Sequence, residues 1–323
     1  MPTEWAAAFA GERVLVIGDL MLDEFIWGKV SRISPEAPVP VVNVTGESYY
    51  PGGAANVARN VREFTRNTAV IGLAGSDSQG RRLIGLLEEA GIDTSGVQIS
   101  DAFPTIVKTR VIARNQQVVR IDRERTGFTG SSETTTNIER VIAKYDAIIV
   151  ADYGKGFVTQ PLADSLTAAA RAYRKILTVD PHPHTSLSWR GVTAIKPNRA
   201  EAFLAAGLPP EDSAEALHEA AKRLLERWQS ENLLITLGEQ GMLLCTAGCP
   251  PHPIPARAQT VFDVSGAGDT AIAVLTLALA AGATPIEAAE LANRASGIVV
   301  GKLGTATVTP AELFSNPSKP ADS

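Results

Sequence analysis

Arg13-Val-Leu-Val-Ile-Gly-Asp19 is a short apolar run that ends in Gly-Asp. Consecutive apolar residues of this kind are typical of a parallel strand that is buried on both faces and opens onto a loop at its carboxyl end. Similar runs recur at residues 69–73, 147–150, 176–179, 194–195 and 233–237. Helical patterns such as residues 80–90 and 213–226 separate most of these runs. We therefore predict an α/β fold with a doubly wound, mostly parallel sheet flanked by helices.

Residues 24–44 and 105–123 break this rhythm, because β-branched residues there alternate with polar or charged ones. Such alternation indicates strands with one face in water. We predict that both segments form antiparallel strands of a small sheet, a lid that projects from the core, since ligands of open α/β sheets bind beyond the carboxyl ends of the strands. We expect one domain over residues 1–316 with these lid strands inserted into it, and a disordered tail over residues 317–323.

The composition excludes several classes of protein. Of the 323 residues, 45% are hydrophobic and 20% are charged, and the formal net charge is −5, which is typical of a globular protein with a large core. Because acidic and basic residues are interspersed, we predict no nucleic-acid partner. The longest apolar stretch, residues 271–283, is shorter than the roughly 18 residues of a membrane span, so we predict a buried helix there and no membrane partner.

Cys245 and Cys249 are the only cysteines in the chain, which excludes a disulfide scaffold. A zinc site built from both thiols and His252 is the alternative to incidental thiols. We favour incidental thiols, because zinc ligands usually come as two closely spaced pairs. The N-terminal residues lack the basic segment and the cleavage site of a secretory signal, so we expect a cytoplasmic protein.

Asp263-Val-Ser-Gly-Ala-Gly-Asp-Thr270 directly precedes the long apolar stretch. Gly266, Ala267 and Gly268 place unhindered backbone N–H groups at a helix start, where free donors and the helix dipole favour an anion. Asp269 lies among these amides. Its carboxylate can therefore accept a proton from an attacking hydroxyl while the amides hold a phosphoryl group. The alternative is that Asp269 only caps the helix.

The same glycines match the G-x-G-x-x-A pattern of dinucleotide-binding enzymes, and Glu287 stands near the position of the acid that binds ribose. That fold needs a strand ending in the acid, whereas here a long apolar helix follows and Glu287 comes after Pro285 at a helix start. A dehydrogenase is therefore only an alternative. The chain contains no G-x-x-x-x-G-K-[ST], which excludes a Walker-type phosphate loop.

Pro51-Gly-Gly-Ala-Ala-Asn-Val-Ala58 is a second glycine pair ahead of a helix. Gly52 and Gly53 allow the backbone to come close to a polyhydroxylated ligand, because they carry no side chain. Asn56 can reach such a ligand from the first turn of the helix. The glycine pair is equally compatible with an ordinary turn.

With these two motifs, the chain resembles the PfkB or ribokinase family of carbohydrate kinases over essentially its whole length. The resemblance implies a ribokinase-like fold and an enzyme that uses ATP and Mg²⁺ to phosphorylate a sugar. It implies that Asp269 deprotonates the sugar hydroxyl and that Gly266, Ala267 and Gly268 form the anion hole for the γ-phosphate. It also implies a homodimer that pairs through the lids.

Four further stretches resemble the branch of this family that phosphorylates heptose 7-phosphate at C1. They are Gly18-Asp-Leu-Met-Leu-Asp23, Ser31-Arg-Ile-Ser-Pro-Glu-Ala-Pro-Val-Pro40, Ala151-Asp-Tyr-Gly-Lys-Gly156 and Lys302-Leu-Gly-Thr-Ala-Thr307. This resemblance implies a sugar phosphate substrate and a place in ADP-heptose and lipopolysaccharide inner-core synthesis. Many members of the branch are fused to a nucleotidyltransferase, and we expect this chain to be the free-standing form.

A phosphorylated sugar calls for cationic ligands. Lys108, Arg110 and Arg114 share the parity of one strand face, so we predict that they converge on the sugar phosphate. A solvated lid strand that carries surface bases is an equal alternative. Lys155 follows a predicted strand between two glycines and is a rival ligand for this phosphate.

Several polar residues stand at the ends of predicted strands. Asp19 and Asp152 are natural acceptors for sugar hydroxyls, although aspartates at strand ends also form ordinary turns. On the nucleotide side, the resemblance implies that Thr236, Gly238 and Asn293 line the pocket.

Asn198-Arg-Ala-Glu201 follows a predicted strand end at Lys196-Pro197 and matches the N-x-x-E element of the family. The resemblance implies that Asn198 and Glu201 serve the nucleotide phosphates, with Glu201 binding Mg²⁺ through water. A carboxylate that acts through water suits Mg²⁺, which gives up its hydration reluctantly. The same two residues form a capping box, and both roles can hold together.

Val179-Asp-Pro-His-Pro-His184 departs from the family pattern Val-Asp-Pro-Lys-Gly. The lysine that the family places near the phosphates is absent, and His182 stands in its place, so we carry no phosphate role over to this position. Two alternatives stay open: a ribokinase-like kinase of another sugar, sugar phosphate or nucleoside, and a non-catalytic sugar-binding protein on the same fold. The intact Asp269 argues against the second.

Overall fold

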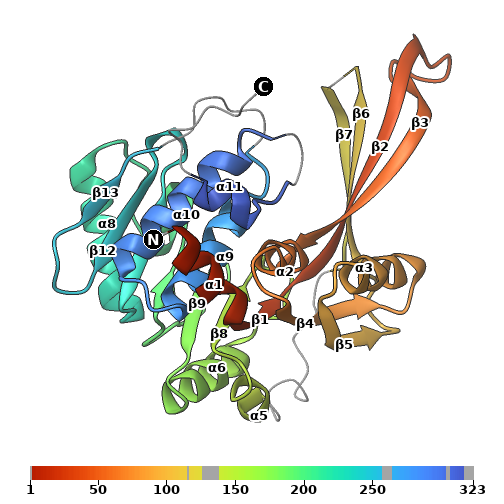
Figure 1. Ribbon diagram of the computed structural model, residues 1–323. Coiled ribbons are helices and arrows are strands. Elements are labelled where there is room, and N and C mark those ends of the chain that lie inside the picture. The colour runs from red at the N-terminus through yellow and green to blue at the C-terminus, as the bar shows by residue number, and fades with distance from the viewer. Residues whose placement is uncertain (1, 115, 126–137, 257–263, 303–305, 316–323) are drawn as a thin grey trace.

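The computed structural model describes residues 2–114, 116–125, 138–256, 264–302 and 306–315. Within these residues a large sheet of nine strands has the order β13-β12-β11-β10-β9-β8-β1-β4-β5 (Figure 1). Its strands are β1 (Arg13–Gly18), β4 (Asn67–Gly75), β5 (Asp93–Ser100), β8 (Ala147–Ala151), β9 (Ile176–Asp180), β10 (Ala194–Ile195), β11 (Asn232–Thr236), β12 (Met242–Thr246) and β13 (His252–Ile254).

All neighbouring strands from β11 to β5 pair parallel, whereas β12 and β13 pair antiparallel at one edge. The six apolar runs identified in the sequence all coincide with parallel strands, which confirms the doubly wound, mostly parallel sheet. The sequence did not indicate β5, β12 or β13. These strands lie at or near the two edges, and β5 is mainly polar, so the pattern of a buried parallel strand is absent there.

Helices cover both faces of the large sheet. One face carries α1 (Pro2–Gly11), α2 (Ala54–Arg62), α3 (Ser78–Glu89), α9 (Ala267–Ala280), α10 (Pro285–Val299) and α11 (Pro310–Phe314). The other carries α5 (Ile138–Ile142), α6 (Gln160–Ala172), α7 (Arg199–Ala206) and α8 (Ala214–Trp228). Because successive residues of a strand point to opposite faces, Val14 and Val16 belong to the first core and Leu15 and Ile17 to the second.

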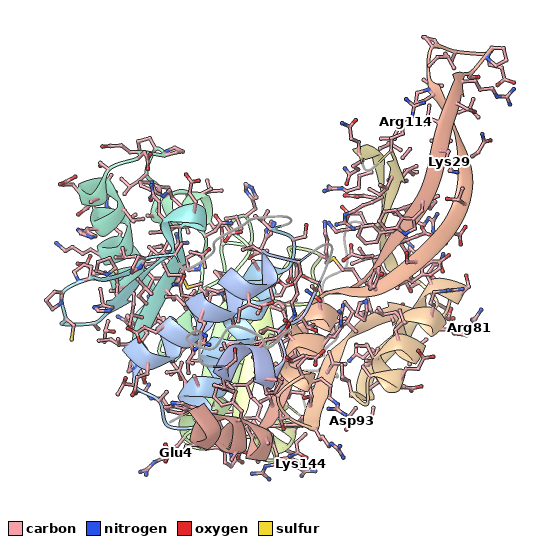
Figure 2. The ribbon with its side chains drawn as sticks, turned by 45° about the horizontal axis from the view of Figure 1, so that its top comes forward. Glu4, Lys29, Arg81, Asp93, Arg114 and Lys144 are labelled. Atoms are coloured by element: carbon pink, nitrogen blue, oxygen red, sulfur yellow. The ribbon has the colours of Figure 1, made fainter. Side chains whose placement is uncertain are left out.

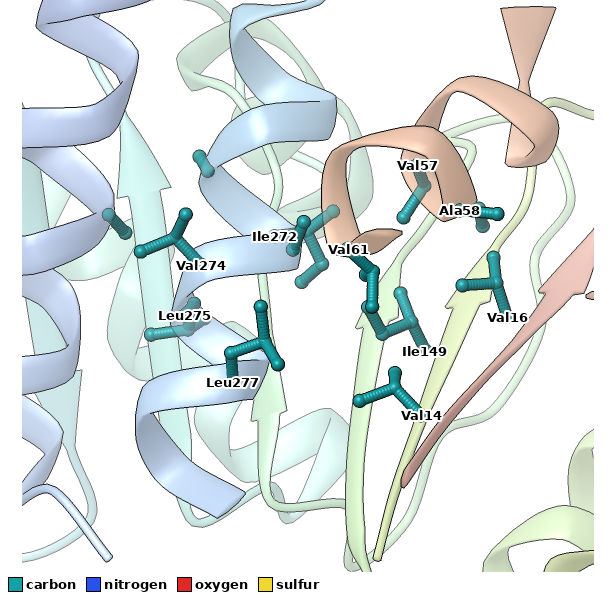
Figure 3. Packing of buried hydrophobic residues seen from close by; sticks show 14 of the residues in the cluster. Val14, Val16, Val57, Ala58, Val61, Ile149, Ile272, Val274, Leu275 and Leu277 are labelled. Atoms are coloured by element: carbon teal, nitrogen blue, oxygen red, sulfur yellow. The ribbon is translucent and has the colours of Figure 1, made fainter. Parts of the chain in front are cut away.

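Helix α9 has no solvent-exposed face over most of its length, since every residue from Ala271 to Leu279 is buried. It lies beside α2 and packs over β8 and β9, and Ile272, Val61 and Ile149 pack together between the two helices and the sheet (Figure 3). Burial of each such side chain contributes about 1.5–3 kcal/mol. The prediction of a buried helix in this stretch is confirmed, and no helix of the described residues is long and apolar enough to cross a membrane.

A second sheet projects from the body (Figure 1) and has the order β3-β2-β6-β7. Its strands are β2 (Leu20–Ile33), β3 (Pro40–Gly53), β6 (Ile106–Ala113) and β7 (Gln116–Arg123), and we call this sheet the lid. The hairpins β2–β3 and β6–β7 are antiparallel, as predicted. The seam between β2 and β6 is parallel, because both strands leave the body in the same direction. The lid is therefore not antiparallel throughout. The predicted tail, residues 317–323, lies outside the described residues.

Gly53 joins the lid to the body at the end of β3, with φ 58° in the left-handed region. A Cβ built on Gly53 would lie 2.6 Å from the carbonyl oxygen of Asp19 and 2.8 Å from Cε of Met21. We expect Gly53→Ala to lower the free energy of unfolding by about 2 kcal/mol or more, because it adds backbone strain and a steric conflict. The midpoint of urea unfolding measures this loss.

Gly46→Ala is the matched control for this substitution. Gly46 lies in the same strand, and a Cβ built there meets nothing within 4 Å. The control should leave the unfolding midpoint close to that of the wild type. Equal midpoints for the two variants would contradict the account of Gly53.

Candidate active site

The start of α9 forms the centre of the site. Gly266 precedes the helix with φ 81°, in the left-handed region, and its carbonyl oxygen accepts the Thr270 N–H at 2.9 Å. The Ala267 N–H donates to the carbonyl oxygen of Val264 at 3.3 Å within the turn. The amides of Gly268 and Asp269 precede the first intrahelical bond and have no acceptor within the helix. The predicted helix start is therefore present, although Asp263, the first residue of its motif, lies outside the described residues.

Asp269 lies in the first turn of α9, and each of its carboxylate oxygens accepts a short hydrogen bond. The side-chain amide of Asn56 in α2 donates to Oδ2 at 2.6 Å. The hydroxyl of Tyr153, in the loop after β8, donates to Oδ1 at 2.6 Å. Two segments that are far from α9 in the sequence thus fix this carboxylate, which is how a preorganised group is held.

A second polar link joins α2 to α9. The hydroxyl of Thr270 donates to Oδ1 of Asn60 at 2.7 Å, and the Asn60 amide donates to the carbonyl oxygen of Asn56 at 2.9 Å. Asn60 and Thr270 are both fully buried, so these bonds are shielded from water. The first turn of α9 is therefore held against α2 by two adjacent side-chain contacts.

The charge of Asp269 is tuned by its surroundings. Burial is the main cause that raises the pKa of the Asp269 carboxyl, and the negative charge of Asp23 raises it further. The hydrogen bonds from Tyr153 and Asn56, and the ammonium group of Lys196, oppose this rise in the pKa. The residue retains partial exposure. A carboxylate with a raised pKa is a stronger base, which suits it to accept a proton from a hydroxyl.

Asp19 and Asp152 shape the loop that carries Tyr153. The carboxylate of Asp19 accepts three backbone N–H bonds from the segment between Tyr153 and Phe157, at 2.9 to 3.1 Å. Asp152 accepts the Thr185 hydroxyl at 2.6 Å. Both aspartates are buried, with 2% and 5% of their surface exposed. Their direct contact with sugar hydroxyls stays a prediction, and their visible role is to hold the loop.

Two of the predicted phosphate ligands lie on one face of the lid. Lys108 and Arg110 occupy alternate, partly exposed positions of β6. Arg110 pairs with Asp23 of β2 at 2.5 Å, and its guanidinium lies 5.3 Å from the centre of the Phe25 ring. Gly52 lies on β3, the other neighbour of β2, and any side chain at this position would collide with the Asp23 carboxylate. The predicted shared face therefore exists for Lys108 and Arg110.

The other two predicted phosphate ligands lie elsewhere. Lys155 pairs with Glu124, which follows β7, at 2.7 Å, and so links the body to the base of the lid. Arg114 comes after the end of β6 at φ 53° and donates to the carbonyl oxygen of Val30 at 3.0 Å. Figure 2 shows Arg114 well out along the projecting lid. Parity placed Arg114 with Lys108 because the end of the strand could not be read from the sequence.

Asn198 and Glu201 form the capping box of α7. The Asn198 N–H donates to Oε2 of Glu201 at 2.7 Å, and the Glu201 N–H donates to Oδ1 of Asn198 at 2.9 Å. Thr236, the last residue of β11, lies beside Asn198, and its N–H donates to Pro197 at 3.0 Å. These residues meet at the carboxyl edge of the sheet, where ligands of such folds bind.

Two other residues predicted for the nucleotide pocket lie near the same edge. Gly238 opens the short 3-10 helix η1 (Gly238–Gln240) with φ 61°. Asn293 of α10 is buried, and its side-chain amide donates to the carbonyl oxygen of Pro255 at 2.8 Å. Their contact with a nucleotide stays a prediction.

A buried ion pair beside the start of α9 was missed by the sequence reasoning. Nζ of Lys196, just after β10, lies 3.0 Å from Oδ2 of Asp180 at the end of β9. A Cβ built on Gly268 would lie 3.4 Å from the same Nζ. Burial raises the pKa of Asp180 to about 7, against the opposing charge of Lys196. Both residues stand at strand ends, but only the strand order shows that these ends are neighbours.

The dinucleotide-binding alternative does not fit this geometry. Helix α9 leads directly into α10, with no strand between them. Glu287, the candidate ribose ligand, accepts the Thr284 N–H at 2.9 Å and the Thr284 hydroxyl at 2.7 Å. It is therefore the acid of a capping box at the start of α10.

Comparisons with known proteins show which family the chain matches. The sequence profile of the pfkB family carbohydrate kinases matches residues 12–312. The chain is 45% identical over 308 residues to "Bifunctional protein HldE" of Desulfatibacillum aliphaticivorans, covering 94% of this chain and 63% of that protein. It is 43% identical over 313 residues to the protein of the same name in Magnetococcus marinus, covering 95% and 64%. The chain thus spans less than two thirds of the length of these relatives.

Solved structures show the same fold. The Arabidopsis thaliana ribokinase complexed with ribose and ATP superposes with a TM-score of 0.74 at 17% identity, over 94% of this chain and 97% of that one. The Escherichia coli phosphofructokinase-2 in complex with substrates and products gives a TM-score of 0.75 at 18% identity, over 93% and 97%. These likenesses confirm the predicted ribokinase-like α/β fold.

The aspartates of the site predict how stability depends on pH. Burial raises the pKa values of Asp19, Asp152, Asp180 and Asp269, so the folded protein binds protons that the unfolded chain has released. Stability should therefore fall as pH rises from the unfolded value of about 4 through the folded value of Asp180, about 7. Carboxyls whose pKa values are lowered in the folded protein are already ionised in both states within this pH window, so they do not change the slope of stability there.

We expect the melting temperature of the wild type to fall by several degrees between about pH 5 and pH 8. Asp180→Asn combined with Lys196→Met should flatten this slope, because the pair no longer titrates. Differential scanning calorimetry at four pH values measures both proteins. Parallel slopes would show that Asp180 does not govern the effect.

Proposed function

The chain belongs to the pfkB family of carbohydrate kinases, and from this premise we propose that it phosphorylates the C1 hydroxyl of D-glycero-β-D-manno-heptose 7-phosphate. The product is the 1,7-bisphosphate, an intermediate of ADP-heptose and lipopolysaccharide inner-core synthesis. ATP as co-substrate follows from the family. The observation that carries the chemistry is the Asp269 carboxylate, which is fixed by two hydrogen bonds beside helix-start amides that have no acceptor within the helix. The four stretches shared with the heptose 7-phosphate branch support the choice of sugar.

The transfer needs one base and one anion site. In the proposed reaction Asp269 accepts the proton of the C1 hydroxyl. The hydroxyl oxygen forms a bond to the γ-phosphorus, the bond from phosphorus to the bridging oxygen of ADP breaks, and ADP leaves with the electron pair. Among the described residues, each carboxylate oxygen of Asp269 accepts one side-chain hydrogen bond, which leaves a lone pair for the sugar.

The amides at the start of α9 supply the anion site for the γ-phosphate. The N–H groups of Gly268 and Asp269 have no acceptor within the helix, and the positive end of the helix dipole lies at the same point. Because these donors are part of the fold, they need no rearrangement as charge develops on the phosphate. Base and anion site are adjacent residues of one helical turn.

Glu201 fits a Mg²⁺ ion that is held through water. One of its oxygens is used in the capping box, and its charge raises the pKa of nearby Asp180, a repulsion that a hydrated cation would offset. When bound, Mg²⁺ neutralises charge on the nucleotide phosphates. Asn198 orients the Glu201 carboxylate through the capping box.

In the proposed reaction the lid excludes water from the site and carries side chains that bind the sugar phosphate. Strand β2 begins directly after Asp19, so a movement of the lid carries Asp23, Lys108 and Arg110 relative to Asp269. Closure over both substrates would exclude water that otherwise hydrolyses ATP.

A dimer through the lid is part of the proposal. Large apolar side chains are exposed along the lid strands, at Trp27, Ile33, Val44, Val119 and Ile121. Pairing of two lids would remove this apolar surface from water.

Asp269→Asn tests the base. It keeps the shape of the side chain but cannot accept the proton, so we expect kcat to fall by about 10²–10⁴-fold with little change in ATP affinity. A coupled ADP-release assay measures kcat, and calorimetry measures nucleotide binding. Asp146→Asn is the matched control. Asp146 pairs with Arg13 at 2.7 Å at the amino ends of β1 and β8, away from the site. Near-normal turnover in the Asp269 variant would refute its assignment as the base.

Lys108→Ala tests the grip on the distal phosphate. Arg110 and Lys155 are each committed to a carboxylate, whereas for Lys108 no ion pair occurs among the described residues. A charge-assisted contact is worth about 1.5–3 kcal/mol, so kcat/KM for heptose 7-phosphate should fall by about 10–100-fold. The value for unphosphorylated heptose should stay unchanged.

Lys29→Ala is the control, because Lys29 is exposed farther along the lid (Figure 2). If Lys108→Ala lowered kcat/KM equally for both sugars, Lys108 would not bind the phosphate.

A further inference from the structure

We propose that Lys196 is a further catalytic residue, whose ammonium group binds the γ-phosphate of ATP at the start of α9 and stabilises the charge that develops during transfer. This inference rests on the proposed phosphoryl transfer but not on the identity of the sugar. It assigns a direct role to a lysine that the motifs of the sequence did not single out.

The fold places Lys196 at the carboxyl edge of the sheet. Strand β10 pairs parallel to β9 with Ile195 opposite Val179, and the Lys196 N–H continues this ladder to Val179 at 2.9 Å. Lys196 is therefore the first residue past the end of β10, as Asp180 is the last residue of β9. The side chain is 4% exposed and follows a short buried strand.

The ammonium group and the amides of α9 converge on one spot. Nζ of Lys196 lies 3.4 Å from the point that a Cβ on Gly268 would occupy. The absence of a side chain at Gly268 therefore keeps the space between the ammonium group and the helix start open. A phosphate at the amides of Gly268 and Asp269 would be within reach of Nζ, and a cation there adds to the stabilisation by backbone donors.

The partner of Lys196 does not cancel its charge fully. Asp180 is the only carboxylate that forms an ion pair with Lys196 among the described residues. Burial raises the pKa of Asp180 to about 7, against the opposing charge of Lys196, so this carboxyl holds its negative charge less readily than an exposed aspartate. A buried cation with incomplete compensation is costly in free energy, and an anionic ligand would relieve that cost. The pair is thus better suited to receive a phosphate than to stabilise the fold.

Lys196 also accounts for the departure at His182. The family pattern has a lysine at this position after β9, and here the imidazole packs against Gly154, where a Cβ would lie 2.6 Å from Nδ1. The ends of β9 and β10 are neighbours in the sheet. We infer that the cation missing after β9 is supplied by Lys196 after β10.

The test must separate a direct role from a purely structural one. Lys196→Met alone leaves Asp180 buried without its partner, so loss of activity could reflect damage to the fold. Lys196→Met combined with Asp180→Asn removes both charges and keeps the volumes similar. If Lys196 only balances Asp180, this double variant should regain activity.

We expect both the single and the double variant to lose about 10²-fold or more in kcat, as enzymes do when one preorganised donor to a developing charge is removed. Affinity for a non-hydrolysable ATP analogue should fall by about 10-fold, whereas affinity for ADP should change by less than about 2-fold. Lys222→Met, at an exposed position of α8, is the control. Melting curves confirm that each variant is folded.

Activity of the double variant within about threefold of the wild type would overturn the proposal, as would equal losses of affinity for the ATP analogue and ADP. The assay uses whichever sugar the wild type phosphorylates fastest, with heptose 7-phosphate as one member of a panel. If another sugar wins, the proposed substrate fails while Lys196 is still tested. If the wild type transfers phosphate to no sugar, the proposed function fails, and the two binding constants still decide whether Lys196 contacts the terminal phosphate.

Discussion

The structure depends on one constraint: helix α9 is buried on all sides from Ala271 to Leu279, and its first amides, which have no acceptor within the helix, need a partner outside it. A helix that is apolar all round has no freedom to slide or to rotate toward water. Because core packing fixes the position of the helix, it also fixes the positions of Asp269 and of the glycines before it. The two polar links to α2, through Asn56 and Asn60, secure the same turn from the side.

Around this helix start the protein holds charges that are unfavourable for folding alone. Asp269 and Asp180 both have pKa values raised by burial, and Lys196 is buried beside them. Groups of this kind lower stability at neutral pH, and their retention is typical of sites where function takes precedence over stability. The carboxylate of Asp19 accepts hydrogen bonds from backbone amides of the loop after β8. This holds the loop so that the Tyr153 hydroxyl donates to Asp269. Asp19 thus supports the site indirectly, through the loop that carries Tyr153.

Much of this could be predicted from the sequence, because the decisive signals are local. The buried runs identified the central strands, and the glycines before an apolar run identified the start of α9, where the anion site is predicted. The pairing of Lys196 with Asp180 could not be predicted, since it depends on β9 and β10 being neighbours. The same is true of the parallel seam between β2 and β6. Arg114 was grouped with Lys108 by strand parity. Parity no longer holds beyond the end of a strand, and the end of β6 is set by the turn rather than by the sequence pattern.

The central claim is that the start of α9 gathers the terminal phosphate of ATP beside Asp269. The most direct measurement is a crystal structure of the complex with ADP, aluminium fluoride and heptose 7-phosphate. The account predicts the fluoride group, which mimics the transferring phosphoryl, at the amides of Gly268 and Asp269, with the C1 hydroxyl within hydrogen-bonding distance of the Asp269 carboxylate. A fluoride group bound elsewhere, or a sugar hydroxyl that faces another base, would contradict it.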